Sequence, residues 1–456
     1  MSVARRTPAL LTALLAAAWL AGCSSHVDRL AGVRQQFFRG DLTAARAEIV
    51  RLREKPKRDE DVLLLDQAIV ELFDGQPRQA ERLLRTVRDR FDHLEQKDVV
   101  ESAKAMLTDD TRLAYSGEDH ERILIRAMLA LSNLMGDGGD AEAYSLQIAA
   151  KQRELIDRAG GFEEHPELES LQVALGPYLR ATLQEERQTN PDEVVRNRAM
   201  VVSWQPDFRD GQVDLARAES APLCPPGQGV VHIIAMVGAG PIREERSEIP
   251  TQAAMLIADR ILSALAKQNV PPTLAPIRVP VVVRRVNRIQ HLKVAVDDRP
   301  AGETATLVDV GRLAEAHFES RRAEILGRAV ARRALKKGII YGVKEGTGAH
   351  AAPVLDFALN VLGVAWEAAE APDTRCWGLL PDRIQVLRLE LPAGQRSLQL
   401  TPGDQAGKFG FPALTEIEVE DGRSSYVLVN FPDSHLVGKV LKTGWDEPIR
   451  IAGDAE

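Results

Sequence analysis

Apolar and polar residues alternate with helical spacing through the first part of the chain. From Val33 to Asn190 the sequence is rich in Ala, Leu, Glu and Arg, and its apolar residues recur every three or four positions. This period places the apolar side chains on one face of a helix. We therefore expect residues 33–190 to form an all-helical domain.

Within this region a pattern recurs around a glycine. Gly40 is followed five residues later by the small residue Ala45, and Gly75 is followed at the same offset by Ala80. A small residue at this offset lets a second helix pack closely on the first. A third unit is expected at residues 123–155, with matching positions at Leu131, Gly138, Ala143 and Ala150.

The spacing of these glycines is close to the tetratricopeptide period of about 34 residues. The helical region therefore resembles the tetratricopeptide repeat family, although aromatic positions of the consensus are missing and residues 97–118 break the period. The resemblance implies a helical solenoid whose concave surface binds a protein or an extended peptide. A bundle of antiparallel helices has the same amphipathic pattern and is the alternative.

The pattern changes after Asn190-Pro191, and the run Ala221-Pro222-Leu223-Cys224-Pro225-Pro226-Gly227-Gln228-Gly229 cannot continue a helix. We place a linker at residues 191–228. The next range, 229–382, contains segments with the helical spacing of apolar residues and segments with the pattern of strands, and it predicts a mixed α/β domain. Strands are expected over Val230–Val237 and over a pair, Ile277–Val286 and His291–Val296, with helices over Thr251–Gln268 and Leu313–Lys337.

Short alternating segments separated by turn residues dominate residues 383–456 and predict a small antiparallel β-sandwich-like domain. The predicted strands are Ile384–Leu391, Ser397–Leu400, Leu414–Val419, Tyr426–Asn430 and Leu436–Leu441. The fold class predicted for the whole chain is α+β: a tetratricopeptide-like helical solenoid, then the mixed α/β domain, then the β-sandwich-like domain.

The N-terminus has the order of an export signal. Arg5 and Arg6 precede an apolar run over residues 9–20, which is too short to span a bilayer as a permanent helix. The run ends in Leu-Ala-Gly-Cys, which resembles the lipobox of bacterial lipoproteins. The resemblance implies a leader at residues 1–22, cleavage between Gly22 and Cys23, acyl chains on Cys23 and a lipidated linker at 23–32.

Several acyl chains on one residue hold a protein on a membrane almost permanently. Ser24 follows the cysteine, and in similar lipoproteins this favours the outer membrane, with the protein facing the periplasm. The alternative is an ordinary secretory leader that is cleaved after Ala21 or Gly22, in which Cys23 is incidental.

The charge and the cysteine content of the chain limit the kinds of ligand and crosslink that are expected. The chain has 58 Lys and Arg against 66 Asp and Glu, so it lacks the basic surface that general nucleic-acid binding needs. In an oxidising compartment Cys224 and Cys376 can form a disulfide; the alternative is that each is a buried, small apolar residue. Neither cysteine has neighbours with metal-ligand spacing, so no metal is expected.

Two glycine-rich segments invite a nucleotide-binding interpretation that their details do not support. Gly238-Ala239-Gly240 follows a predicted strand, but Arg243 stands where a dinucleotide fingerprint has its third glycine. Lys344-Glu345-Gly346-Thr347-Gly348 lacks the Gly-Lys-Ser/Thr order of a phosphate loop. We expect turns or loops at both places, and no cofactor.

Two predicted helices, one amphipathic and one apolar, have two interpretations: contact with a membrane, or packing in the hydrophobic core of the protein. The basic helix Arg321–Lys337 could lie against anionic headgroups, but packing of Ile325, Leu326, Ala329 and Val330 into a core is the favoured interpretation. The run Val354–Ala369 is expected to be a core helix, since charges interrupt it.

A motif around the third cysteine, Cys376, carries a second resemblance. Asp373-Thr374-Arg375-Cys376-Trp377, followed by Leu379-Leu380-Pro381, is similar to a motif in a family of bacterial lipoproteins that has no assigned activity. That family joins a tetratricopeptide-like N-terminal half to a C-terminal α/β and β-rich region. We expect Arg375 and Trp377 to fix the start of the terminal β-domain by stacking and hydrogen bonding.

These features together predict a lipid-anchored scaffold or adaptor of the cell envelope, without catalysis. Its expected partners are a membrane, through the lipid, and an envelope protein. The alternatives are a regulator or enzyme of peptidoglycan assembly, and a lipoprotein that binds a small ligand or a glycan. No oligomeric state is predicted.

Overall fold

The computed structural model covers most of the chain between residues 26 and 443. It describes residues 26–56, 58–105, 115–158, 160–161, 163, 172–188, 190–220, 224–265, 276–346 and 372–443. The expected leader, the cleavage site at Gly22 and Cys23, and the helix expected over 354–369 lie outside the described residues. The loop expected over 344–348 is not found in its described part, since Lys344, Glu345 and Gly346 end a helix, and from Thr347 onward it lies outside the described residues.

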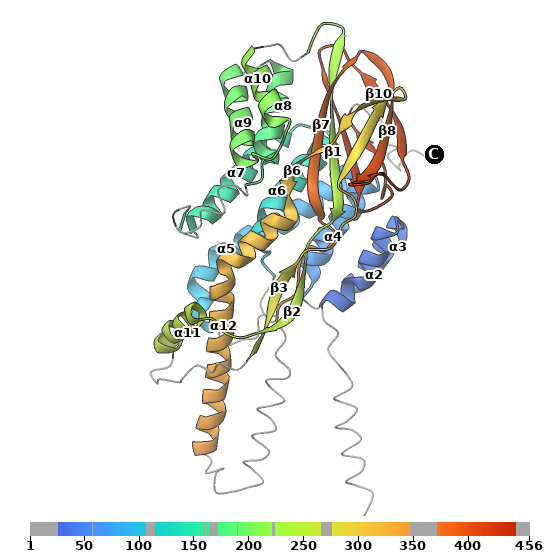
Figure 1. Ribbon diagram of the computed structural model, residues 1–456. Coiled ribbons are helices and arrows are strands. Elements are labelled where there is room, and N and C mark those ends of the chain that lie inside the picture. The colour runs from blue at the N-terminus through green and yellow to red at the C-terminus, as the bar shows by residue number, and fades with distance from the viewer. Residues whose placement is uncertain are drawn as a thin grey trace, which may run out of the picture.

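Helices fill the described chain before the first strand, as the period predicted (Figure 1). Neighbours in chain order pack against each other. The last two occupy most of the range expected to be a linker, because Pro191 stands at the start of α9, where its fixed φ suits a first helical turn. The helices are α2 (His26–Phe38), α3 (Leu42–Arg53), α4 (Glu60–Phe73), α5 (Pro77–Ala105), α6 (Asp119–Leu134), α7 (Ala141–Arg158), α8 (Leu175–Arg187), α9 (Pro191–Trp204) and α10 (Gly211–Ser220).

The glycines that were expected at helix turns lie at those turns. Gly40, Gly75 and Gly138 separate α2 from α3, α4 from α5, and α6 from α7, with φ values of +84°, +83° and +71°. This left-handed conformation suits glycine because it has no Cβ. Ala45 and Ala80, five residues after the first two glycines, are fully buried.

The third unit departs from the expected register. Ala143 and Ala150 are exposed, and the buried positions of α7 are taken instead by Tyr144 and Ile148. Helix α7 begins three residues after its turn glycine, whereas α3 and α5 begin two residues after theirs. The longer turn shifts every buried position by one residue.

Strands after residue 227 form three sheets. The largest has the order β12-β11-β1-β7-β6, the second has the order β10-β8-β4-β5 with β9 paired to β8, and β2 pairs with β3. The strands are β1 (Gln228–Ala239), β2 (Ile242–Glu248), β3 (Ile277–Val283), β4 (His291–Val296), β5 (Arg299–Glu303), β6 (Ala305–Asp309), β7 (Pro381–Pro392), β8 (Gly394–Asp404), β9 (Gly407–Lys408), β10 (Ala413–Val419), β11 (Ser424–Phe431) and β12 (Leu441–Lys442).

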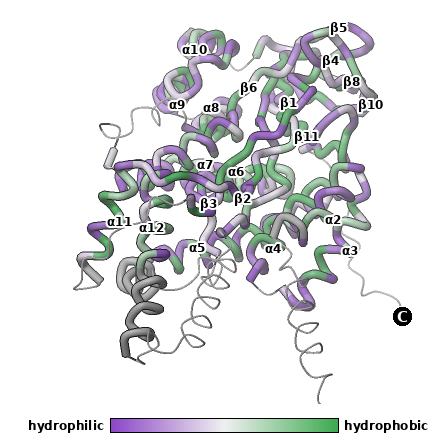
Figure 2. Tube along the Cα trace, turned by 60° about the horizontal axis from the view of Figure 1, so that its bottom comes forward, coloured by the Kyte–Doolittle hydropathy of each residue, from purple (hydrophilic) through white to green (hydrophobic). Residues whose placement is uncertain are grey.

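Pairing differs from the sequence prediction in two places. The expected pair of β3 and β4 does not form, because β3 pairs with β2 and β4 pairs with β5 and β8. The strand expected over Leu436–Leu441 reduces to β12 at its last position. Asp297 and Asp298, both at positive φ, make the two-residue turn between β4 and β5, and this turn is hydrophilic (Figure 2).

Strand β1 is the middle strand of the largest sheet. It pairs parallel with β11 and antiparallel with β7, so strands from the expected α/β range and from the expected β-sandwich range share one sheet. Ile234 and Met236 face one hydrophobic core, while Ile233 and Ala235 face another. The long apolar run of β1 follows from this burial on both faces.

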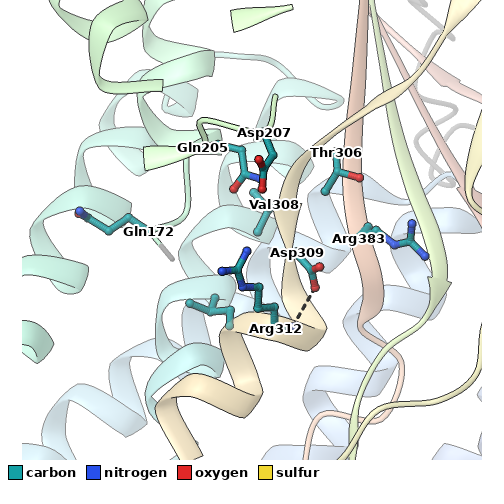
Figure 3. A pocket seen from close by; sticks show the side chains of 9 residues that line it. Gln172, Gln205, Asp207, Thr306, Val308, Asp309, Arg312 and Arg383 are labelled. Atoms are coloured by element: carbon teal, nitrogen blue, oxygen red, sulfur yellow. Dashed lines mark hydrogen bonds between the residues drawn. The ribbon is translucent and has the colours of Figure 1, made fainter. Parts of the chain in front are cut away.

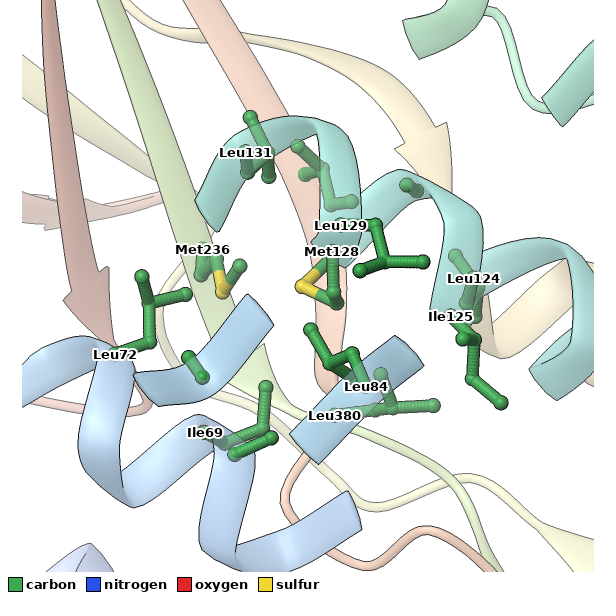
Figure 4. Close-up of a cluster of buried hydrophobic side chains, with 14 of the residues drawn as sticks. Ile69, Leu72, Leu84, Leu124, Ile125, Met128, Leu129, Leu131, Met236 and Leu380 are labelled. Atoms are coloured by element: carbon green, nitrogen blue, oxygen red, sulfur yellow. The ribbon is translucent and has the colours of Figure 1, made fainter. Parts of the chain in front are cut away.

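The first core joins the helices to the sheet. Side chains of α4, α5 and α6 meet Met236 of β1 and Leu380, which precedes β7 (Figure 4). Every residue of α4 from Val62 to Phe73 is buried. The described helices therefore do not form a solenoid with an open concave surface, because the sheet covers their inner side.

A third core holds α11 (Gln252–Leu265) and α12 (Val310–Gly346) against β3. Leu326 and Val330 are buried in it, which agrees with the core interpretation of the basic helix. Arg322 is turned to Glu248, at 2.9 Å. None of the described helices combines the length and the hydropathy needed to cross a bilayer.

Candidate functional site

The segment 373–381, which carries the Asp-Thr-Arg-Cys-Trp motif, runs between the helices and β7; we call it the connecting segment. Its backbone is held by two buried carboxylates. The Trp377 amide donates to Glu121 of α6 at 2.6 Å, and the Leu379 amide donates to Asp66 of α4 at 3.2 Å. The Trp377 side chain is 1% exposed. This segment therefore joins the helical region to the sheet.

Arg375 stacks on Tyr115 and donates hydrogen bonds, whereas Trp377 donates only its main-chain amide, and these contacts are made to the helical side rather than to the β-domain. The Arg375 guanidinium pairs with Asp373 at 2.6 Å and lies 5.2 Å from the centre of the Tyr115 ring. It also donates to the carbonyl of Arg58 at 3.0 Å. The stacking and hydrogen bonding expected of the pair are found for the Arg375 side chain, with helical partners, whereas the Trp377 ring is buried and its Nε1 has no hydrogen-bond partner in the described chain.

Burial shifts the ionisation of the carboxylates around the connecting segment. Burial raises the pKa of Asp66 to about 7, against an opposing effect of the nearby Arg34 guanidinium. Burial also raises the pKa of Glu121, although its hydrogen bonds favour the charged form. Both carboxylates accept hydrogen bonds from main-chain amides of the connecting segment, so they hold that segment in place.

The disulfide that the sequence allowed is not formed. Cys224 and Cys376 are both free thiols. Cys376 is buried and its sulfur lies 3.8 Å from Nη2 of Arg34, whereas Cys224 donates to the carbonyl of Gln228 at 3.0 Å. Each sulfur has its own partner in a different part of the fold. The burial of Cys376 agrees with the alternative to a disulfide, in which this cysteine is a buried, small apolar residue.

The glycine-rich segment lies at the end of β1, so the turn or loop expected here reduces to residues 240–241, between β1 and β2. Gly238 has a φ of +77°, and a Cβ on Gly240 would lie 2.5 Å from the carbonyl oxygen of Leu380. Asn287 bridges both backbone groups of Ala239, at 2.9 and 3.0 Å. Gly238 therefore allows a left-handed backbone conformation, and Gly240 allows the close approach of the chain to the connecting segment.

A polar pocket lies where segments distant in the sequence meet (Figure 3). Its volume is about 180 Å³, which is smaller than the roughly 300–1,000 Å³ of pockets for larger ligands. It lies between the turn after α9, the junction of β6 with α12, and β7. The lining residues are Gln172, Gln205, Asp207, Thr306, Val308, Asp309, Arg312, Leu313 and Arg383.

Two charged residues of the polar pocket are already engaged. Asp309 accepts a hydrogen bond from the Arg312 amide at 2.8 Å, which caps α12, and it lies 3.2 Å from Arg284. Arg383 pairs with Asp382 at 3.2 Å. These contacts fix the walls of the pocket.

The other two charged side chains are not engaged. Within the described chain, the Arg312 guanidinium and the Asp207 carboxylate form no hydrogen bond and no ion pair. The pocket is therefore lined by a positive and a negative group that do not pair with each other.

A second exposed feature lies at the edge of the second sheet. Strand β10 is the last strand of that sheet, and Phe411 and Leu414 are 74% and 71% exposed. Lys442 donates to the Glu416 carbonyl at 2.7 Å, which covers the middle of the strand. We call Phe411, Leu414 and the outer side of β10 near them the β10 edge.

The sequence did not indicate the polar pocket. Asp309 followed by Arg312 is the spacing of a helix cap, and it would have moved the expected helix start from Leu313 to Val310. Arg312 and Asp207 line the same pocket only through the tertiary fold, which leaves no local pattern in the sequence. Among the residues that the structure describes, no group of His, Cys, Asp and Glu side chains is arranged to hold a metal ion.

Comparisons with known proteins were made at three levels. The chain matches no family model, no curated protein and no solved structure. The interpretation of its function therefore depends on its own residues and their geometry.

Proposed function

We propose that this protein is a lipid-anchored adaptor of the cell envelope that binds an extended segment of a protein partner at the β10 edge. The anchor is Cys23, exposed by cleavage after Gly22, and the address is the outer membrane, facing the periplasm. The basic leader, the apolar run and the Leu-Ala-Gly-Cys order support this. Helix α2 begins at His26, three residues after Cys23, so most of the range 23–32 that was expected to be a linker is helical.

The observation that carries the partner proposal is the exposure of Phe411 and Leu414. Most large apolar side chains of the described chain are buried, whereas these two are more than 70% exposed and three residues apart. Exposed apolar groups on an edge strand, which has one side without a neighbouring strand, are features of a protein contact. An extended segment of a partner can add to such a strand through main-chain hydrogen bonds and place its side chains on the apolar pair.

The helical region supports the adaptor proposal in a second way. We interpret its units as degenerate tetratricopeptide repeats, on the basis of their turn glycines and small residues. Asp66 and Glu121, on the inner helices α4 and α6, accept hydrogen bonds from the backbone of the connecting segment. The helices thus hold an extended piece of their own chain, and the surface that is left for a partner lies elsewhere.

Crosslinking and affinity purification from solubilised envelopes test this proposal. The double variant Phe411→Asp, Leu414→Asp should lose the partner and keep its thermal unfolding temperature, because both side chains are exposed. Val213→Asp is the matched control, since Val213 is 66% exposed on α10 and lies outside the β10 edge. Equal recovery of a partner by wild type and the double variant would contradict the proposal.

Binding of a small ligand is a second candidate function. The specific observation in its favour is the pair of unengaged, opposite charges in the polar pocket. The two candidates use different surfaces, so one chain can carry both.

A further inference from the structure

We propose that the polar pocket binds a free α-amino acid with a small side chain, such as glycine or alanine. The Arg312 guanidinium would receive the carboxylate, and the Asp207 carboxylate would receive the ammonium group. This inference deepens the second candidate function and does not depend on the lipid anchor or on the β10 edge.

The charge arrangement selects a ligand that carries both signs. Arg312 and Asp207 line the same pocket without reaching each other. In Figure 3 the Arg312 guanidinium points toward the side of the pocket that bears Gln205 and Asp207. A simple anion would be attracted by Arg312 but repelled by Asp207, and a simple cation would meet the opposite difficulty. A zwitterion satisfies both groups.

The two charged residues stand on firmly held elements. Arg312 lies in the first turn of α12, whose start is capped by Asp309. Asp207 lies beside Phe208, which is 3% exposed and fixes the turn after α9. The Phe208 amide donates to the Gln205 carbonyl at 3.0 Å. Such a frame reduces the ordering cost of binding.

The remaining lining suits a small, compact ligand. Gln205 presents an amide that has no partner in the described part of the chain. Val308 and Leu313 are 2% exposed and form an apolar floor. A volume of about 180 Å³ leaves room for several water molecules, which an amino acid of this size can replace. A larger side chain would have to leave the pocket.

Isothermal titration calorimetry on the full-length, detergent-solubilised protein tests the proposal. Glycine and alanine are the ligands, and propionate and ethylamine are analogues that lack the ammonium group and the carboxylate. We expect each analogue to bind at least about tenfold more weakly than alanine, since each loses one charge-assisted contact. Equal binding of alanine and propionate, or no heat with either amino acid at millimolar concentration, would overturn the proposal.

Variants assign the binding to this pocket. Arg312→Gln and Asp207→Asn should each weaken alanine binding by at least about tenfold, because each removes one charge. Both side chains are exposed, so the variants should unfold at the wild-type temperature. Arg299→Gln, an exposed arginine outside the pocket, is the control and should bind alanine like wild type. Wild-type binding by both pocket variants would refute the site, whatever the fate of the adaptor proposal.

Discussion

The carboxylates that surround the connecting segment and the charged residues of the polar pocket differ in their burial and in their hydrogen bonding. In the first region Asp66 and Glu121 are buried and bonded to backbone amides. In the second, Arg312 and Asp207 are exposed and have no partner in the described chain. Buried charges that hold a backbone serve the fold, whereas an exposed pair that stays apart is available to a ligand.

The largest effect should come from removing the indole of the connecting segment. Trp377→Ala should lower the free energy of unfolding by about 3–5 kcal/mol, because it opens a cavity in the core that joins helices and sheet. Urea unfolding followed by circular dichroism measures this. Phe411→Ala is the exposed aromatic control and should change stability by less than about 0.5 kcal/mol. Similar small losses in both variants would remove the structural role given to this segment.

An intermediate effect should appear as a change in acid sensitivity. Burial lowers the pKa of His120 and of His317 to about 4. The unfolded chain therefore binds protons that the folded chain does not, and these groups make stability fall as the pH drops from about 6.5 to about 4. Asp66, with a pKa raised to about 7, acts in the opposite direction, since its protonation favours the folded state as the pH falls below 7.

Asp66→Asn removes that opposing contribution. We expect its stability to fall more steeply than that of wild type between pH 7 and pH 5, by about 1–3 kcal/mol over the interval. The measurement is urea unfolding across this pH range. His317→Gln should show a shallower fall than wild type, and the exposed variant Asp298→Asn should follow wild type. Parallel curves for Asp66→Asn and wild type would exclude the proposed ionisation of Asp66.

The smallest effect on stability should come from the polar pocket. Arg312→Gln and Asp207→Asn should each change the free energy of unfolding by less than about 0.5 kcal/mol, because neither side chain has a partner to lose. Differential scanning calorimetry measures this. A loss above 1 kcal/mol in either variant would mean that the charge contributes to the fold, and the contrast between the two regions would disappear.

The sequence predicted those elements that have a strong local pattern. The apolar run of β1, the helical period before residue 190 and the turn glycines Gly40 and Gly75 were all found where they were expected. Strand β2 was missed because Arg243-Glu244-Glu245-Arg246 has no apolar alternation: residues 244–247 are exposed, and the buried residue, Arg243, is charged. An apolar pattern in the sequence marks buried side chains, and few side chains of β2 are buried.

The pairing of strands, and the residues that come together from distant segments, could not be predicted from local sequence patterns. Strand β1 pairs with β7 and β11, which lie more than a hundred residues away along the chain. The sequence placed these strands in separate domains, because no short-range pattern records a partner so distant. For the same reason neither the carboxylates under the connecting segment nor the residues of the polar pocket were found.

Mass spectrometry of the N-terminal peptide from the native, membrane-extracted protein tests the envelope account most directly. The account predicts that the chain begins at Cys23 and that its sulfur carries a thioether-linked diacylglyceryl group. An intact leader, or an unmodified thiol at Cys23, would contradict the anchor and with it the proposed role as an envelope adaptor.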